Sequence, residues 1–128
     1  MIAVAGDRNL INSDVVEING KPLKSEREPI ESLEAIRDHI DRDVFYETQS
    51  GVRYLVMLGV DDAGQSETAQ PPTDLVVPRR CVFVMGDNRS RSRDSRQFAP
   101  IHVGDVIGYV DYLYWPAANW SRFGVYRD

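Results

Sequence analysis

Residues 81–100 read CVFVMGDNRSRSRDSRQFAP, an apolar run that leads directly into a charged loop. Cys81–Met85 is typical of a buried β-strand, and the Gly-Asp-Asn sequence at 86–88 favours a sharp turn because these residues tolerate unusual backbone angles. The loop that follows alternates arginine with serine, and Asp87 and Asp94 can each take an arginine in a charge-assisted pair. Because the loop is short and lies between two strand-like segments, the pattern predicts an ordered connection and not a flexible tail.

The arginine–serine alternation also suggests a nucleic-acid-binding tract, and the charge of the chain bears on that alternative. The 128 residues carry a formal net charge of −5. Residues 1–78 hold 15 acidic and 7 basic side chains, whereas residues 79–128 hold 5 acidic and 8 basic ones. A nucleic-acid-binding domain normally has a much stronger basic excess. The balance predicts no nucleic-acid partner, while a local basic patch stays an open alternative.

Elsewhere the apolar pattern is mostly that of short strands separated by turn sequences. Asn19-Gly20 between apolar flanks is a strong signal for a type I′ hairpin, and a second hairpin is expected at Gln49–Gly51. The pattern predicts a mainly β fold, in which antiparallel strands form a partly open barrel or sheet within one domain, residues 1–128. The expected strand segments are Ile2–Ala5, Val15–Ile18, Lys21–Leu23, Val44–Thr48, Val52–Val60, Leu75–Val77, Cys81–Met85, Val106–Val110 and Tyr112–Trp115.

Two segments break the strand pattern. Pro29–Ile40 places apolar residues near helical spacing, and Glu31 and Glu34 come early, where carboxylates suit the helix dipole. This predicts one short surface helix near residues 29–40. Residues 61–74 are rich in Gly, Gln, Ser and Thr and contain two adjacent prolines, which predicts an exposed loop.

The sequence offers no pattern for a cofactor or a metal ion. His39 and His102 are far apart, and neither has a Cys or a second His at metal-ligand spacing. The only cysteine, Cys81, lies in an apolar run and is expected to be a small core residue. No glycine loop of the Walker or dinucleotide type occurs. No stretch is long and apolar enough for a membrane span, and the N-terminus lacks the layout of a signal peptide.

The charged loop also matches a specific family pattern. Gly-Asp-Asn-Arg-x-x-Ser-x-Asp-Ser-Arg is matched by Gly86, Asp87, Asn88, Arg89, Ser92, Asp94, Ser95 and Arg96. In this pattern, and over VPRRCVFVMGDNRSRSRDSRQFAPIHVGDVIGYVDYLYWP, the chain resembles the C-terminal part of type I signal peptidases. These are membrane-bound serine endopeptidases that cut signal peptides from exported proteins. The segments IAVAGDR and VVEINGKPL resemble earlier family segments in the same order. Ser90 and Arg91 depart from the Asp-Asn often found there, and residues 29–40 look like an insertion.

The resemblance also shows what this chain lacks. Family catalysis uses a serine nucleophile in a Ser-Met motif and a lysine general base. The family pattern puts that lysine two residues before Met1, and Lys21 and Lys24 lie elsewhere. No Ser-Met pair occurs. We therefore expect the C-terminal portion of a signal peptidase, without the membrane anchor, the catalytic serine or the catalytic lysine.

The resemblance implies a role for each residue of the loop. The Ser92 hydroxyl would orient the missing general-base lysine. Asp87 would pair with the arginine that follows that lysine, which is also missing. Asp94 and Arg96 would pair with each other and keep the loop rigid, and Gly86 would permit close packing beside the site. The other residues that support the site are Asn88, Arg89 and Ser95.

From these roles we expect the complete enzyme to cleave signal peptides of exported preproteins, with small apolar side chains before the cut. The enzyme would be anchored in the bacterial cytoplasmic membrane, with this domain on its outer face. The chain alone is expected to be inactive and needs no cofactor or metal. Strand edges that once paired with the missing half make self-association a further expectation. An alternative is a naturally truncated, non-catalytic homologue that acts as a peptide-binding or assembly module.

Overall fold

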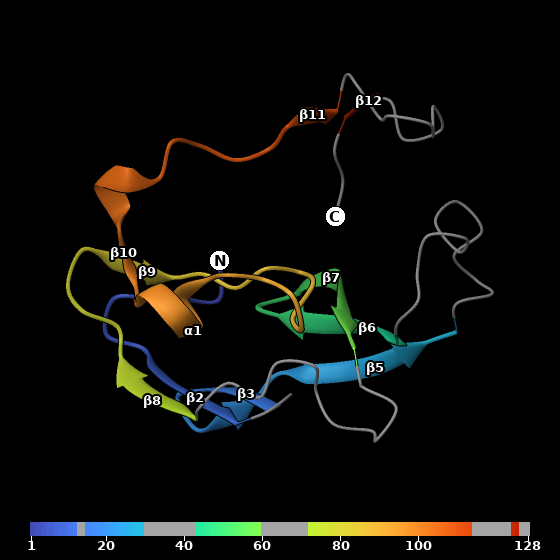
Figure 1. Ribbon diagram of the computed structural model, residues 1–128, viewed down its shortest axis with the longest axis horizontal. Helices are drawn as coiled ribbons and strands as arrows, with labels where there is room; N and C mark the ends of the chain where they lie inside the picture. Colours follow the sequence, from blue (N-terminus) through green and yellow to red (C-terminus); the bar gives the residue numbers. More distant parts are fainter. Residues whose placement is uncertain (13–14, 30–42, 60–71, 114–123, 126–128) are drawn as a thin grey trace.

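The computed structural model describes residues 1–12, 15–29, 43–59, 72–113 and 124–125, which lie mostly in short strands (Figure 1). Within these ranges no helix is long and apolar enough to cross a membrane. The elements are β1 (Ala3–Val4), β2 (Arg8–Asn12), β3 (Val15–Ile18), β4 (Lys21–Pro22), β5 (Lys24–Glu28), β6 (Asp43–Gln49), β7 (Val52–Leu58), β8 (Thr73–Val76), β9 (Cys81–Phe83), the helix α1 (Ser95–Phe98), β10 (Ile101–His102), the 3-10 helix η3 (Val103–Asp105), β11 (Tyr112–Leu113) and β12 (Gly124–Val125).

The largest sheet has the strand order β4-β3-β2-β8, and all its neighbours are antiparallel. β3 and β4 are joined by the expected hairpin. Asn19 and Gly20 have φ of 53° and 75°, the positive angles that a type I′ turn requires. β2 was not among the predicted strands. It is a strand because it alternates exposed and buried residues between two partners, β3 and β8.

A second sheet has the order β5-β6-β7. The predicted hairpin is confirmed here: β6 and β7 pair along seven residues each, and Ser50 and Gly51 take the positive φ angles of the turn, 51° and 82°. β5 was not predicted, because its sequence KSERE shows no apolar alternation. β5 adds to β6 mainly through the backbone ladder and through exposed charge pairs such as Arg27–Asp43 at 2.5 Å.

The core lies where the small sheet β1-β9-β10 meets the β4-β3-β2-β8 sheet. Phe83 of β9 is fully buried, and it packs in one cluster with residues of both sheets. The other buried members of the cluster are Ile2, Ala3, Ile11, Val16 and Val77. Cys81 is partly buried against this cluster, as expected of a small apolar side chain. The core therefore fixes β9, the strand from which the charged loop departs.

The prediction of a mainly β, antiparallel fold is confirmed, and the described strands form open sheets without a closed barrel. The segment Val106–Val110 was wrongly predicted as a strand. It runs as an exposed arm above the body and pairs with none of the described strands (Figure 1). Residues 73–74 belong to β8 and not to a loop. Most of the predicted helix at 29–40 and most of the loop at 61–74 lie outside the described residues.

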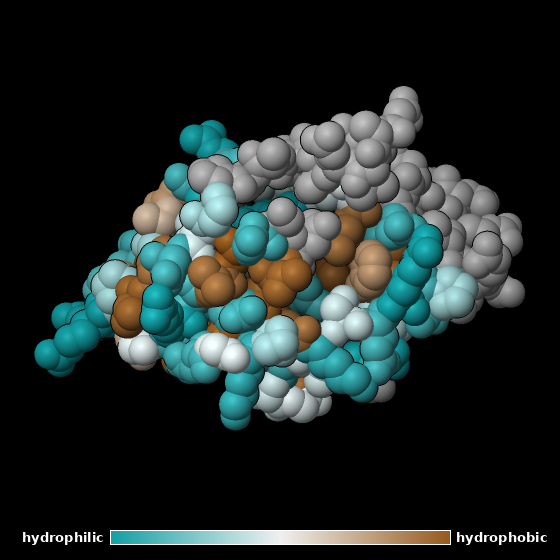
Figure 2. Space-filling view, turned by 90° about the horizontal axis from the view of Figure 1, so that it is seen from below, coloured by the Kyte–Doolittle hydropathy of each residue, from teal (hydrophilic) through white to brown (hydrophobic). Residues whose placement is uncertain are grey.

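Apolar side chains are not confined to the core. Figure 2, the view from below, shows apolar side chains gathered near the centre of this face among polar ones. The arm is the other exposed apolar region: Ile107 is fully exposed and Tyr109 is 87% exposed. An apolar segment with this exposure is a candidate contact surface.

Candidate functional site

The charged loop begins after β9 and ends at α1, and two hydrogen bonds connect its two ends. The Ser95 amide donates to the Val84 carbonyl at 3.1 Å, and the Val84 amide donates to Ser95 Oγ at 3.0 Å. Ser95 is almost fully buried, so these two bonds are shielded from water. These two hydrogen bonds therefore join the two ends of the loop between Val84 and Ser95.

Inside this closure, Asp94 holds the loop together. Its carboxylate accepts the amide of Gly86 at 2.9 Å and the amide of Arg96 at 3.1 Å, which makes it the N-cap of α1. The Arg96 guanidinium donates to both carboxylate oxygens, at 2.8 and 2.7 Å. Burial raises the pKa of Asp94, but the hydrogen bonds from Arg96 and Gly86 outweigh burial and leave the pKa below its ordinary value. The predicted pairing of Asp94 with Arg96 is therefore present.

Gly86 and Ser92 lie in direct contact across the loop. A Cβ atom on Gly86 would lie 1.8 Å from Ser92 Oγ and 2.5 Å from Ser92 Cβ, so only glycine fits at position 86. Ser92 is partly buried, and its hydroxyl makes no hydrogen bond to any other described residue. The loop thus presents a hydroxyl group that is held in place by packing and is still available to a partner.

Arg89 anchors the loop to β6. Its guanidinium donates to both carboxylate oxygens of Glu47, at 2.9 and 2.5 Å, and its Nε donates to the Gly86 carbonyl at 3.1 Å. Both side chains of the ion pair are only 5% exposed. The sequence singled out Arg89 but not Glu47. The available signal was a carboxylate in the middle of the strand-like run VFYETQ, where a buried charge needs a partner.

The loop also extends the β5-β6-β7 sheet. Met57 forms a parallel bridge with Asn88: the Met57 amide donates to the Asp87 carbonyl at 2.8 Å, and the Arg89 amide donates to the Met57 carbonyl at 2.9 Å. The buried Ser90 hydroxyl accepts from the Gly59 amide at 2.5 Å and donates to the Gly59 carbonyl at 3.1 Å. Ser90, one of the two departures from the family pattern, is therefore part of the anchor.

The turn residues at the start of the loop have local roles. The Asp87 carboxylate is exposed and accepts the amide of Asn88 at 2.8 Å. Asn88 Oδ1 accepts the amide of Arg91 at 3.3 Å. The structure does not test the pairing of Asp87 with an arginine that the resemblance implies.

Tyr54 borders the buried ion pair. It lies directly opposite Glu47 in the β6–β7 pairing, and its hydroxyl is buried without a hydrogen-bond partner among the described residues. Burial, and then the charge of the Glu47 carboxylate, raise the pKa of Tyr54 to about 12. The phenol is therefore neutral at physiological pH.

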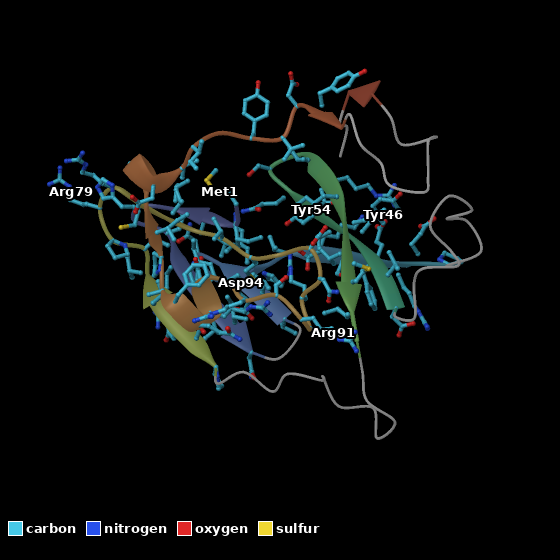
Figure 3. The ribbon with its side chains drawn as sticks, turned by 45° about the horizontal axis from the view of Figure 1, so that its top comes forward. Met1, Tyr46, Tyr54, Arg79, Arg91 and Asp94 are labelled. Carbon is cyan, nitrogen blue, oxygen red and sulfur yellow. The ribbon has the colours of Figure 1, made fainter. Side chains whose placement is uncertain are left out.

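Among the described residues, the charged side chains near the loop differ in where they lie. In Figure 3, Asp94 lies beside α1 and Arg91 lies at the far end of the loop beside β7, whereas Arg79 projects away from the molecule. Among the described residues, Arg89 and Arg96 each form a buried ion pair. In the described part of the chain, no three His, Cys, Asp or Glu side chains gather in a way that could hold a metal ion. The site is thus a polar loop around Ser92 that is held by hydrogen bonds and by two buried ion pairs.

Comparison with known proteins gives this loop a context. The family model described as signal peptidase, peptidase S26, matches residues 1–115. Signal peptidase I of Bacillus caldolyticus is 28% identical over 116 residues, which are 91% of this chain and 52% of that protein. Thylakoidal processing peptidase 1, chloroplastic, of Arabidopsis thaliana is 38% identical over 54 residues, which are 42% of this chain and 16% of that protein.

Signal peptidase IB of Staphylococcus aureus is 35% identical over 51 residues, which are 40% of this chain and 27% of that protein. The chain thus spans about half the length of the Bacillus relative and less of the other two. No solved structure matches the chain.

Proposed function

The chain belongs to the signal peptidase family, peptidase S26, and on that premise we propose that it is the part of a membrane-anchored serine endopeptidase that orients the general base. The substrates of the complete enzyme are signal peptides of exported preproteins with small apolar side chains before the cut. This domain lies on the outer face of the bacterial cytoplasmic membrane. The observation that carries the proposal is the partly buried Ser92 hydroxyl, which has no partner among the described residues and is held in a loop fixed by two buried ion pairs.

In this proposal Ser92 acts through the general base and not on the peptide bond. A lysine that takes a proton from a serine nucleophile must be neutral, and a neutral amine needs a hydrogen-bond partner to orient it. The Ser92 hydroxyl can donate to the amine nitrogen or accept from it. Because the hydroxyl sits against Gly86, its position is set before the lysine arrives, which limits the cost of ordering the pair.

The course of the first strand supports this placement. β1 runs antiparallel to β9, and the Ile2 amide donates to the Phe83 carbonyl at 2.8 Å. Residues that precede Met1 in a complete enzyme therefore continue toward Val84–Gly86, where Ser92 packs. The family places its lysine in that preceding segment, so the same antiparallel course supports a general base near Ser92.

The test uses the complete enzyme, with the segment upstream of Met1, and a peptide substrate that contains a signal-peptide cleavage site. Ser92→Ala is expected to lower kcat about 100-fold, because general-base catalysis is worth at least that factor. Arg93→Ala is the matched control, since Arg93 is the next residue and is exposed. The control is expected to keep kcat within about twofold. Full kcat in Ser92→Ala would refute the proposed role.

The isolated 128-residue chain is expected to show no cleavage of the same substrate, because it contains no Ser-Met motif and no lysine at the matching position. The measurement is product formation over hours with the complete enzyme as a positive control. Turnover by the isolated chain that Ser92→Ala abolishes would contradict this expectation and point to a different nucleophile.

A further inference from the structure

We propose that Glu47 is a positioning residue for the general-base site, although it lies on β6, outside the charged loop. Its carboxylate holds the Arg89 guanidinium in a two-point contact, at 2.9 and 2.5 Å. Arg89 in turn belongs to the loop that carries Ser92. The inference rests on the proposed function, because it assigns Glu47 to the support of that same site.

Arg89 is fixed from three directions. Its guanidinium meets Glu47, its Nε donates to the Gly86 carbonyl at 3.1 Å, and its backbone amide donates to the Met57 carbonyl at 2.9 Å. A planar guanidinium with two partners on one carboxylate has little freedom to rotate. The Gly86 carbonyl is thereby tied to β6 through a rigid side chain.

Ser92 packs directly against Gly86 and leaves no room for a methyl group on that residue. The position of Gly86 therefore constrains the position of Ser92. A shift of the Gly86 backbone therefore moves the Ser92 hydroxyl. A displacement of about 1 Å is enough to cost a large factor in rate when a catalytic group must meet its partner in a fixed geometry. Glu47 thus sets the position of Ser92 through Arg89 and Gly86.

Because the Glu47–Arg89 ion pair is buried, the loss of either partner is expected to disturb the loop. Both side chains are 5% exposed, so removing one charge leaves the other without water to solvate it. Glu47→Gln keeps the size of the side chain and removes the charge. In that variant we expect the guanidinium of Arg89 to leave its buried position and the loop to separate from β6.

The first experiment measures amide hydrogen exchange in the isolated chain and needs no catalysis. Glu47→Gln is expected to speed the exchange of the Gly86, Arg89 and Met57 amides about tenfold or more. The Val77 amide donates to the Asp7 carbonyl at the end of the β2–β8 pair, away from the loop, and its exchange rate is expected to stay unchanged.

Arg8→Gln is the matched control variant. Arg8 also makes a two-point ion pair, with Asp74 at 2.9 and 2.8 Å, but that pair is exposed and joins β2 to β8. The Arg8→Gln variant should leave the exchange rates of the loop amides unchanged. Unchanged exchange of these amides in Glu47→Gln would overturn the proposed anchor.

The second experiment separates positioning from general stability and uses the complete enzyme. Glu47→Gln is expected to lower kcat about tenfold or more and leave KM within about twofold. The double variant Glu47→Leu/Arg89→Met replaces the buried charges by apolar groups and is expected to regain thermal stability. It is still expected to show the reduced kcat, because no side chain then holds the Gly86 carbonyl.

The outcomes distinguish this inference from the proposed function. Normal kcat in the stable double variant, while Ser92→Ala remains impaired, would overturn the role of Glu47 and leave the proposed function standing. Normal kcat in Ser92→Ala would overturn the proposed function, and the exchange experiment would still decide whether Glu47 anchors the loop.

Discussion

Ser92 Oγ occupies the space that a side chain on Gly86 would need, since a Cβ atom there would lie 1.8 Å away. The glycine at the start of the loop and the serine that the loop presents are thus fitted to each other. Asp94 reinforces the contact, because its carboxylate accepts the Gly86 amide at 2.9 Å.

Gly86→Ala is therefore expected to lower the free energy of unfolding by about 2 kcal/mol, as is typical when an added atom meets packed neighbours. The matched control is Gly108→Ala, because nothing lies within 4 Å of a Cβ at that position. Urea unfolding followed by circular dichroism measures both. The double variant Gly86→Ala/Ser92→Gly removes the overlapping atoms and should recover most of the loss. A single variant as stable as the control would show that the loop adjusts freely.

Asp94→Asn tests the second buried ion pair and its dependence on pH. The pKa of Asp94 lies below its ordinary value of 3.8 in the folded chain, so its charge stabilises the fold fully above about pH 4. That contribution is lost as the pH falls through the folded pKa. At pH 7 the variant is expected to lose about 3 kcal/mol of unfolding free energy, because Arg96 keeps a buried charge without a partner.

The difference between the two proteins should be smaller at a second, more acidic pH, because the wild-type carboxylate becomes protonated as the pH falls through its folded pKa. Urea unfolding at the two pH values gives the comparison. Asp74→Asn is the control, because its pKa is also lowered but its pair with Arg8 is exposed. A constant difference between wild type and Asp94→Asn at both pH values would contradict the ionised pair.

The sequence predicted features that depend on neighbouring residues. The Asn19-Gly20 turn was predictable because few residues accept positive φ. The pairing of Asp94 with Arg96 followed from the family resemblance, since the loop sequence alone left open which arginine Asp94 takes. Glu47 was not predictable as the partner of Arg89, since the two are 42 residues apart and no local pattern links them.

Strand predictions failed for a related reason. β5 has no apolar alternation, and it is a strand because it pairs with the edge of β6. Val106–Val110 has the apolar content of a strand but has no strand partner among the described residues. Hydrogen bonding to a neighbour, and not the side-chain pattern, decides both cases.

Asn9 is a polar side chain that is buried in the protein interior. It is fully buried on β2, and neither its Oδ1 nor its Nδ2 has a hydrogen-bond partner among the described residues. Asn9→Leu is expected to raise the free energy of unfolding by about 1 kcal/mol, because it removes an unsatisfied amide from the core. Asn12→Leu, on the exposed end of the same strand, should change it by less than about 0.5 kcal/mol. Thermal unfolding measures both, and destabilisation by Asn9→Leu would indicate a bound partner for the amide.

Self-association was expected at strand edges, and the exposed arm is a second candidate surface for it. Ile107 is fully exposed and Tyr109 is 87% exposed, and a second copy of the chain could cover both. We expect the isolated chain to sediment as a concentration-dependent dimer and Ile107→Asp to weaken dimerisation about tenfold or more. Val52→Asp is the control, because Val52 is a separate exposed apolar residue on β7. A chain that stays monomeric at all accessible concentrations would refute this surface as a dimer contact.

The bond between Gly59 and Ser90 joins residues 31 positions apart, and the bond between Glu47 and Arg89 joins residues 42 apart. Bringing together residues this far apart along the chain costs loop-closure entropy. Such contacts therefore tend to form later in folding than local hairpins such as β6–β7. We therefore expect the β6–β7 hairpin to form before the loop docks on it. Changes in that loop should accordingly act on how fast the protein unfolds and scarcely on how fast it folds.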